Sequence, residues 1–306
     1  MTRDPMYDIE KKLPFRVLTE ENWQHWKTWG YVIIRDVVPR EKVESLAATL
    51  WTFSELDPDD EETWYRPKVE NHAMPELCGS GMVEIYQHQH LWDIRQEPRL
   101  YDAFVDIWDR EALWVTLDRA NLNPPNRRNR QFKGFIHWDI DTSVDPLPFD
   151  VQGIVSLVDT NPEMGGTQAY PDMFRGFDDW VATQPADRNP WRPDTEGIGE
   201  PAPLVMKAGD LLIFNSLLAH GVRANTSEHQ VRLAQYVSMF PADEANAALV
   251  EERVTSWREK VTPKKAAFPG DPRGWEKKDP VAELSPLGER LLGLRSWQDE
   301  SVSARQ

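Results

Sequence analysis

The residues best suited to chemistry are a histidine and an aspartate two positions apart, in Phe135-Ile136-His137-Trp138-Asp139. Residues two apart on an extended strand point to the same face, so an imidazole and a carboxylate would lie side by side. Together they supply two ligands of a metal ion. One more histidine from a distant strand would complete the facial triad of non-haem iron(II) oxygenases, and His220 is the candidate.

The spacing of His137 and Asp139 is a weak signal by itself. With seven histidines and 51 acidic residues in 306 positions, this spacing is expected about once by chance. The surroundings of His220 strengthen it, because a Gly209-Asp210 turn and an almost entirely apolar run lead to His220 and Gly221. The alternative is that each histidine is simply buried and bonded to a backbone carbonyl. This would have to hold for both His137 and His220, and it gives no reason for the Asp139 carboxylate to lie inside the protein.

A candidate cation follows the third ligand. Arg232 lies twelve residues after His220, at the start of the next predicted strand. A fixed guanidinium could bind the remote carboxylate of a dicarboxylic keto acid while the other end of the acid binds the metal. An arginine at a strand start is otherwise usually a surface residue, and the spacing here favours the binding role.

Two other groups are weaker candidates. His88 and His90 would share one face if their segment is extended, but no third ligand accompanies them, so we interpret them as pocket wall or surface. Cys78 is the only cysteine. It excludes an intramolecular disulfide and a thiolate zinc site, fits a reducing compartment, and is interpreted as an inert loop thiol.

Hydrophobic periodicity predicts the elements that position these side chains. Thr19 caps a predicted helix over residues 20–29, Gly30 ends it before the apolar strand 31–34, and further helices follow Pro39 and Pro98. Short β-strands are expected at about 82–96 and over the runs 113–122, 131–139, 152–158, 204–206, 211–216 and 232–240. Pro, Gly and Asn turns separate these runs, which is typical of an antiparallel sandwich or barrel.

No repeat or linker divides the chain, so we expect one domain over residues 1–306. It comprises a helical part at 18–110, a β core at 112–240 and a C-terminal helical extension at 241–306. Ser285 begins a short helix in the extension, which is expected to dock on the domain or on a second subunit, giving a homodimer. Residues 182–203 are either a lid or rim loop or a floppy insertion.

Charge and composition exclude some partners. The chain has 35 basic and 51 acidic residues, a net charge of −16, which repels nucleic-acid phosphates and anionic lipid surfaces. The first residues are charged rather than apolar, and no window reaches the length of a membrane span. We therefore expect a cytoplasmic protein with no nucleic-acid or membrane partner. Fourteen tryptophans suit an apolar cavity for a small-molecule substrate.

The sequence resembles the phytanoyl-CoA dioxygenase family of iron(II)- and 2-oxoglutarate-dependent oxygenases over roughly residues 18–240. The residues that carry the resemblance are Leu18-Thr19-Glu20-Glu21 with Trp29-Gly30-Tyr31-Val32-Ile33-Ile34, Asp118-Arg119-Ala120-Asn121 before Pro124-Pro125, His137-Trp138-Asp139, Gly165-Gly166-Thr167 before Pro171, and Gly209-Asp210 through His220, Asn225, Ser227 and Arg232. The resemblance implies a double-stranded β-helix, that is, a cupin-like jelly roll, mainly β with flanking helices.

The resemblance also implies roles for single residues. His137, Asp139 and His220 would bind Fe(II), and Arg232 would hold 2-oxoglutarate, with Asn121 and Thr167 as further cofactor-binding residues. The implied reaction uses O2 to hydroxylate an unactivated carbon of a small metabolite and releases succinate and CO2. Because Asp139 is a carboxylate, hydroxylation is favoured over halogenation.

The substrate does not follow from the resemblance. Several relatives have a hydroxyl where this chain has Val222, and residues 168–172 differ from the pattern common at the pocket rim. The substrate-contact candidates are Arg119, Asp141, Gln152, Tyr170 and Arg175, although Asp141 could instead cap a turn. Three other outcomes use the same cofactors, namely desaturation, epimerisation and cyclisation. A jelly-roll protein that binds a ligand without turnover is a further alternative.

Overall fold

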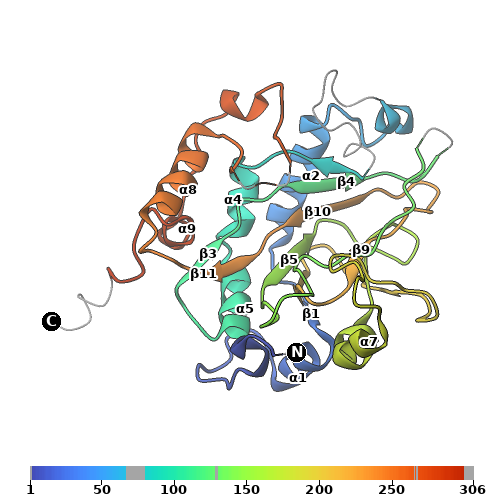
Figure 1. Cartoon of the computed structure of the whole chain (residues 1–306). Helices are drawn as coiled ribbons and strands as arrows, with labels where there is room; N and C mark the ends of the chain where they lie inside the picture. Colours follow the sequence, from blue (N-terminus) through green and yellow to red (C-terminus); the bar gives the residue numbers. More distant parts are fainter. Residues whose placement is uncertain (1, 67–79, 128–129, 265, 267, 300–306) are drawn as a thin grey trace.

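A computed structural model describes residues 2–66, 80–127, 130–264, 266 and 268–299 (Figure 1). Cys78 lies outside these residues, so its interpretation stays a prediction. Helices surround a β core, in agreement with the predicted class. None of the described helices is long and apolar enough to cross a bilayer.

The core contains a large and a small antiparallel sheet. The large one has the strand order β1-β8-β5-β10-β4-β2 and the small one β7-β6-β9, while β11 and β3 form a separate pair. The large sheet consists of β1 (Tyr31–Ile34), β8 (Leu211–Asn215), β5 (Val151–Ser156), β10 (Arg232–Tyr236), β4 (Ala120–Asn123) and β2 (Met82–Val83). The others are β7 (Ala202–Pro203), β6 (Thr167–Ala169), β9 (His220–Val222), β11 (Met239–Pro241) and β3 (Leu113–Val115).

Eight α-helices are described around this core. They are α1 (Glu20–Trp29), α2 (Arg40–Phe53), α4 (Gln89–Arg95), α5 (Pro98–Trp108), α6 (Pro171–Arg175), α7 (Phe177–Thr183), α8 (Ala247–Glu259) and α9 (Pro286–Leu292), with short 3-10 turns η1 (Pro5–Asp8), η2 (Glu61–Tyr65) and η3 (Trp275–Lys278). The predicted first helix is confirmed: Thr19 and Asn22 form a reciprocal capping box. Gly30 ends it at φ +75°, where a side chain would meet the Phe174 ring.

Several strand predictions were wrong in detail. Residues 131–139 form no strand, only isolated bridges such as His137 with His220, because the Trp138 N–H bonds to the Trp191 carbonyl instead of a neighbouring strand. Residues 204–206 follow β7 as coil, and the runs 113–122 and 232–240 each break into two strands. Within 82–96 only Met82–Val83 forms a strand, and Gln89–Arg95 is helix α4, whose buried Leu91, Trp92 and Ile94 follow helical spacing.

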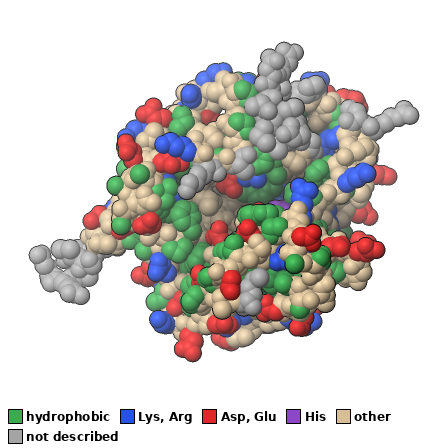
Figure 2. All heavy atoms as spheres, viewed as in Figure 1, with side chains coloured by type: hydrophobic (Ala, Val, Ile, Leu, Met, Phe, Trp, Pro, Cys, Tyr) green, Lys and Arg blue, Asp and Glu red, His purple; other side chains and the backbone are tan. Residues whose placement is uncertain are grey.

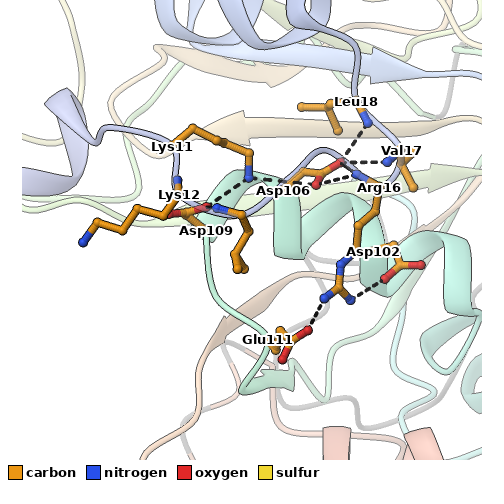
Figure 3. Close-up of polar contacts among 10 residues, drawn as sticks. Lys11, Lys12, Arg16, Val17, Leu18, Asp102, Asp106, Asp109 and Glu111 are labelled. Carbon is orange, nitrogen blue, oxygen red and sulfur yellow. Dashed lines mark hydrogen bonds and ion pairs between the residues drawn. The ribbon is translucent and has the colours of Figure 1, made fainter.

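A buried carboxylate fastens the N-terminal segment to α5 (Figure 3). Asp106 is fully buried and accepts hydrogen bonds from the backbone N–H groups of Arg16, Val17 and Leu18, at 2.8–3.0 Å. These donors satisfy the charge in place of water. The segment leading to α1 is thereby fixed against the core.

The C-terminal extension packs on its own chain, with α8 and α9 beside β3 and β11 (Figure 1). Ser285 caps α9 as predicted, accepting from the Gly288 N–H. The buried Arg253 of α8 donates to the carbonyls of Val115, Leu291 and Leu292, and so joins β3, α8 and α9. The homodimer stays a prediction, as do the domain boundaries.

Candidate active site

His137, Asp139 and His220 converge at one point between the sheets. The Asp139 carboxylate lies 3.2 Å from His137 Nε2 and 3.1 Å from His220 Nε2. One ligand atom from each residue lies within 4.8 Å of the others, and among the described residues this is the one group of three or more such side chains that could hold a metal ion. The predicted convergence is therefore confirmed, although no strand carries His137.

Local backbone geometry sets the orientation of His220. Its Nδ1 lies 2.9 Å from the Leu218 carbonyl, so Nδ1 carries the proton and Nε2 presents a lone pair to the centre. A side chain at Gly221 would overlap the Phe135 carbonyl. Glycine thus lets the two ligand-bearing segments approach closely enough for the His137–His220 bridge.

Asp139 is held as a carboxylate by its neighbours. Burial raises its pKa, but hydrogen bonds and charge from His137 and His220 outweigh burial and leave the pKa below the ordinary value. The Gln152 amide donates to the second oxygen at 2.5 Å. Two imidazole nitrogens and a carboxylate thus face one point, a donor set that suits a divalent metal ion.

These side chains open onto a cavity of about 560 Å³, within the usual range for small-molecule sites. Its wall contains, besides the triad, Met82, Thr116, Asp118, Arg119, Phe135, Asp150, Val151, Gln152, Ile154, Thr167, Phe214, Gly221, Val222, Tyr236, Ser238 and Phe240. Figure 2 shows the surface hollowed near its centre, with histidine visible beside hydrophobic side chains.

Arg232 and Asn121 form a buried pair next to this wall. Arg232 is 1% exposed, and its Nη1 donates to Asn121 Oδ1 at 2.8 Å. Its Nη2 is buried and has no hydrogen-bond partner among the described residues. Neither residue belongs to the cavity wall, but the Met82 sulfur, which does, lies 3.9 Å from the Asn121 amide. An uncompensated guanidinium beside the cavity is suited to bind an anion.

Thr167 lies in the cavity wall. Its Oγ1 is buried, and no residue in the described part of the chain forms a hydrogen bond with it. In the small sheet Thr167 is the register partner of Val222, so the two side chains share one face. Several relatives carry a hydroxyl at the position of Val222. In this chain the Thr167 hydroxyl lies directly across from that position.

The substrate-contact candidates divide into two groups. Arg119 and Gln152 line the cavity. Asp141 does not, because its carboxylate accepts from Ser143 N and Oγ and so caps a turn, as the alternative prediction had it. Tyr170 bonds to the Gly199 carbonyl, and Arg175 bonds to Asp172 and stacks on Trp29, so both lie outside the cavity wall.

Arg119 is fixed by rings and by its neighbour Asp118. Its guanidinium lies 4.8 Å from the centre of the Tyr236 ring and 4.0 Å from that of Phe268. Its Nη1 donates to Asp118 at 2.6 Å. The charge of Arg119 is therefore largely compensated within the protein.

Residues 182–203 pack against the segment that carries the ligands. Arg188 donates to the Thr142 hydroxyl and carbonyl, and the Pro190 and Trp191 carbonyls accept from Thr142 and Trp138. These contacts contradict a floppy insertion and agree with a rim loop. Whether the loop moves as a lid stays a prediction.

The second histidine pair lies elsewhere. His88 caps α4 and His90 lies in its first turn, so the extended geometry considered for them was wrong. They line a different cavity, with Thr49 and Trp275. Their interpretation as pocket wall is thus confirmed.

The sequence analysis missed Asp150, Ser238 and Phe240 in the cavity wall. Burial and the neighbouring Asp139 raise the pKa of the Asp150 carboxyl, and a hydrogen bond from the Val151 N–H only partly offsets them. For Asp150 the available signal was the strand period, since it directly precedes β5 and lies two and four residues before Gln152 and Ile154, which also line the cavity.

Comparison with known proteins identifies the family. The family model described as phytanoyl-CoA dioxygenase matches residues 26–234. The chain belongs to this family. With the His-Asp-His group, this membership makes the protein an iron(II)- and 2-oxoglutarate-dependent dioxygenase. A curated protein of similar sequence is the "Ava biosynthesis cluster protein O" of Aspergillus versicolor, 23% identical over 278 residues, covering 82% of this chain and 88% of that protein.

Solved structures support the fold of this phytanoyl-CoA dioxygenase family member. A hypothetical protein from Escherichia coli has a TM-score of 0.61 at 18% identity, covering 90% of this chain and 82% of that one. The epimerase SnoN, in complex with Fe3+, alpha ketoglutarate and nogalamycin RO, has a TM-score of 0.52 at 16% identity, covering 87% and 95%. The predicted double-stranded β-helix is confirmed.

Proposed function

We propose that this dioxygenase hydroxylates an unactivated carbon of a small-molecule metabolite, with His137, Asp139 and His220 as the iron ligands. The observation that carries the proposal is the convergence of their ligand atoms within 4.8 Å at the wall of a cavity of about 560 Å³. Three protein ligands leave coordination positions for a keto acid and O2. With these bound, the cofactor chemistry couples loss of CO2 from 2-oxoglutarate to oxidation of a substrate C–H bond.

We assign Arg232, Asn121 and Thr167 to 2-oxoglutarate. The unpartnered Arg232 Nη2 and Thr167 Oγ1 supply a charge and a hydroxyl for its remote carboxylate, and Asn121 orients the guanidinium. Met82 lies beside Asn121 in the cavity wall, and its flexible side chain can move aside to give the acid access to Arg232.

The remaining wall would place and shield the substrate. Phe135, Tyr236 and Phe240 line the cavity and exclude water from the reacting groups. The buried Tyr236 hydroxyl has no hydrogen-bond partner within the described ranges, so it can bond a polar group of the bound molecule. We further propose that the protein is cytoplasmic, because a chain with a single cysteine forms no intramolecular disulfide and so suits a reducing compartment.

Metal and keto acid binding provide the first test. Anaerobic addition of iron(II) and 2-oxoglutarate should give a visible charge-transfer band. His137→Ala, Asp139→Ala and His220→Ala should each lose the band and sharply lower iron retention while circular dichroism stays unchanged. Arg232→Ala should retain iron but need more 2-oxoglutarate. A band that survives all three ligand substitutions would refute the assignment.

Product mass then tests the reaction. Metabolites that raise succinate release above the uncoupled background are analysed by mass spectrometry. A gain of one oxygen supports hydroxylation. Loss of two hydrogens would indicate desaturation or cyclisation, and no change in mass would indicate epimerisation.

A further inference from the structure

One acidic side chain in the cavity wall has no counter-charge among the residues that the structure describes. Asp139 belongs to the proposed metal group, and Asp118 is paired with Arg119 at 2.6 Å. Asp150 also lines the cavity, yet it forms no ion pair with a described residue. Its Oδ1 accepts one hydrogen bond, from the adjacent Val151 N–H at 2.8 Å.

Strand register places Asp150 at the opposite end of the barrel from Arg232. In the β5–β10 pair, Ile154 lies opposite Tyr236. Asp150 precedes Ile154 by four residues, and Arg232 precedes Tyr236 by four residues. Because the two strands are antiparallel, these steps run in opposite directions, and each covers about 13 Å from the Ile154–Tyr236 pair. If Arg232 holds the keto acid, Asp150 is left for the other bound molecule.

The surroundings of Asp150 favour a cation with an apolar body. Tyr236 and Phe240 line the same cavity, and aromatic faces attract cations as well as apolar groups. Arg119 does not compete as an anion receptor, because Asp118 compensates its charge and two rings cover it. A carboxylate in a partly enclosed site gains most from a partner of opposite charge.

We propose that the substrate carries a cationic nitrogen, an amine or a guanidine, which pairs with the Asp150 carboxylate while its apolar part lies against the aromatic wall. This inference rests on the proposed function, since it assumes that His137, Asp139 and His220 bind iron and that 2-oxoglutarate lies toward Arg232. Asp150 is thus a specificity-determining residue for the substrate.

Matched compounds test this charge preference. The panel contains sets in which one apolar body carries an amine, an acetamide or a carboxylic acid, such as tryptamine, N-acetyltryptamine and indole-3-propionic acid, and an arylalkyl guanidine series. Dissociation constants are measured by anaerobic calorimetry on enzyme loaded with iron(II) and 2-oxoglutarate. Amines or guanidines should bind at least about tenfold more tightly than their neutral and acidic counterparts.

Variants assign that preference to one side chain. Asp150→Asn should abolish it while the charge-transfer band with iron(II) and 2-oxoglutarate remains. Asp172→Asn, the same charge change on exposed α6, should keep it. Equal or tighter binding of the neutral or acidic compounds, no binding of any cationic compound, or an unchanged preference in Asp150→Asn would overturn the proposal. Loss of the band in the unmodified enzyme would instead refute the proposed function.

Discussion

At the scale of single residues, the site depends on side chains that orient other side chains. His220 is directed by the Leu218 carbonyl and Asp139 by the Gln152 amide. Gln152, a predicted substrate contact, therefore has a second role as a positioning residue. Such outer contacts fix ligand geometry before the metal arrives.

Replacing Gln152 tests this positioning role. Gln152→Ala should weaken iron(II) binding about tenfold to a hundredfold, because Asp139 loses the donor that fixes its second oxygen. Anaerobic metal titration measures the affinity, and a broadened or shifted charge-transfer band would report altered ligand geometry. Gln168→Ala, on nearby β6, serves as the matched control. Equal affinities in the two variants would contradict the role.

At the scale of elements, buried carboxylates join segments that no sheet connects. Asp106 of α5 binds three backbone N–H groups of the N-terminal segment. Glu276 of η3 likewise accepts from the backbone N–H groups of Tyr86 and Gln87, before α4. Each element is therefore held by a buried carboxyl group that accepts hydrogen bonds from the backbone of another segment.

Asp106→Ala should lower the free energy of unfolding by about 3 kcal/mol, because several buried N–H groups lose a charged acceptor. Urea unfolding followed by circular dichroism measures the loss. Asp102→Ala removes a partly exposed carboxylate from the same helix, bonded to Arg16, and should cost well under half as much. Similar losses in both variants would show that Asp106 does not anchor the segment.

Glu276 predicts a pH dependence of stability. Burial raises its pKa to about 7, although the backbone N–H groups of Gln87 and Tyr86 act in the opposite direction. Between about pH 4.5 and 7 the unfolded state is ionised while the folded state keeps its proton, so stability falls as pH rises through this range.

Comparing unfolding free energies at pH 5 and pH 8 tests that dependence. The wild-type protein should lose more stability over this interval than Glu276→Gln, which cannot ionise. Glu259→Gln, an exposed position on α8, should behave like the wild type. If Glu276→Gln loses as much stability as the wild type, ionisation of this carboxyl is not the cause.

At the scale of the whole molecule, the C-terminal extension contributes to the core. Leu291 and Leu292 of α9 are fully buried, and Arg253 bonds to carbonyls on two other elements. Phe268, also in the extension, covers Arg119 at the cavity wall. We expect the extension and the β core to unfold together.

Arg253→Ala should therefore lower the stability of the entire protein, by about 3 kcal/mol, since three buried carbonyls lose a charged donor. Calorimetry and circular dichroism should still report one common transition at a lower Tm. Arg258→Ala, exposed on the same helix, is the control. A separate low-temperature transition would show that the extension is an independent unit.

The sequence by itself determined the cofactor class of this protein. The residue types of His137, Asp139, His220 and Arg232, with glycine turns and apolar runs before them, were sufficient for the metal group and the family, because ligand type and local period are local properties. The first helix and strand followed for the same reason, from a cap at Thr19 and a stop at Gly30.

Tertiary structure decided which side chains share the cavity. Asp141 caps a turn and Tyr170 bonds elsewhere, whereas Asp150 and Phe240 reach the wall. These outcomes depend on strand register and on backbone hydrogen bonds between segments far apart in the chain, such as Trp138 to Trp191. Such pairings are set by packing of the whole core, which the local sequence pattern does not encode.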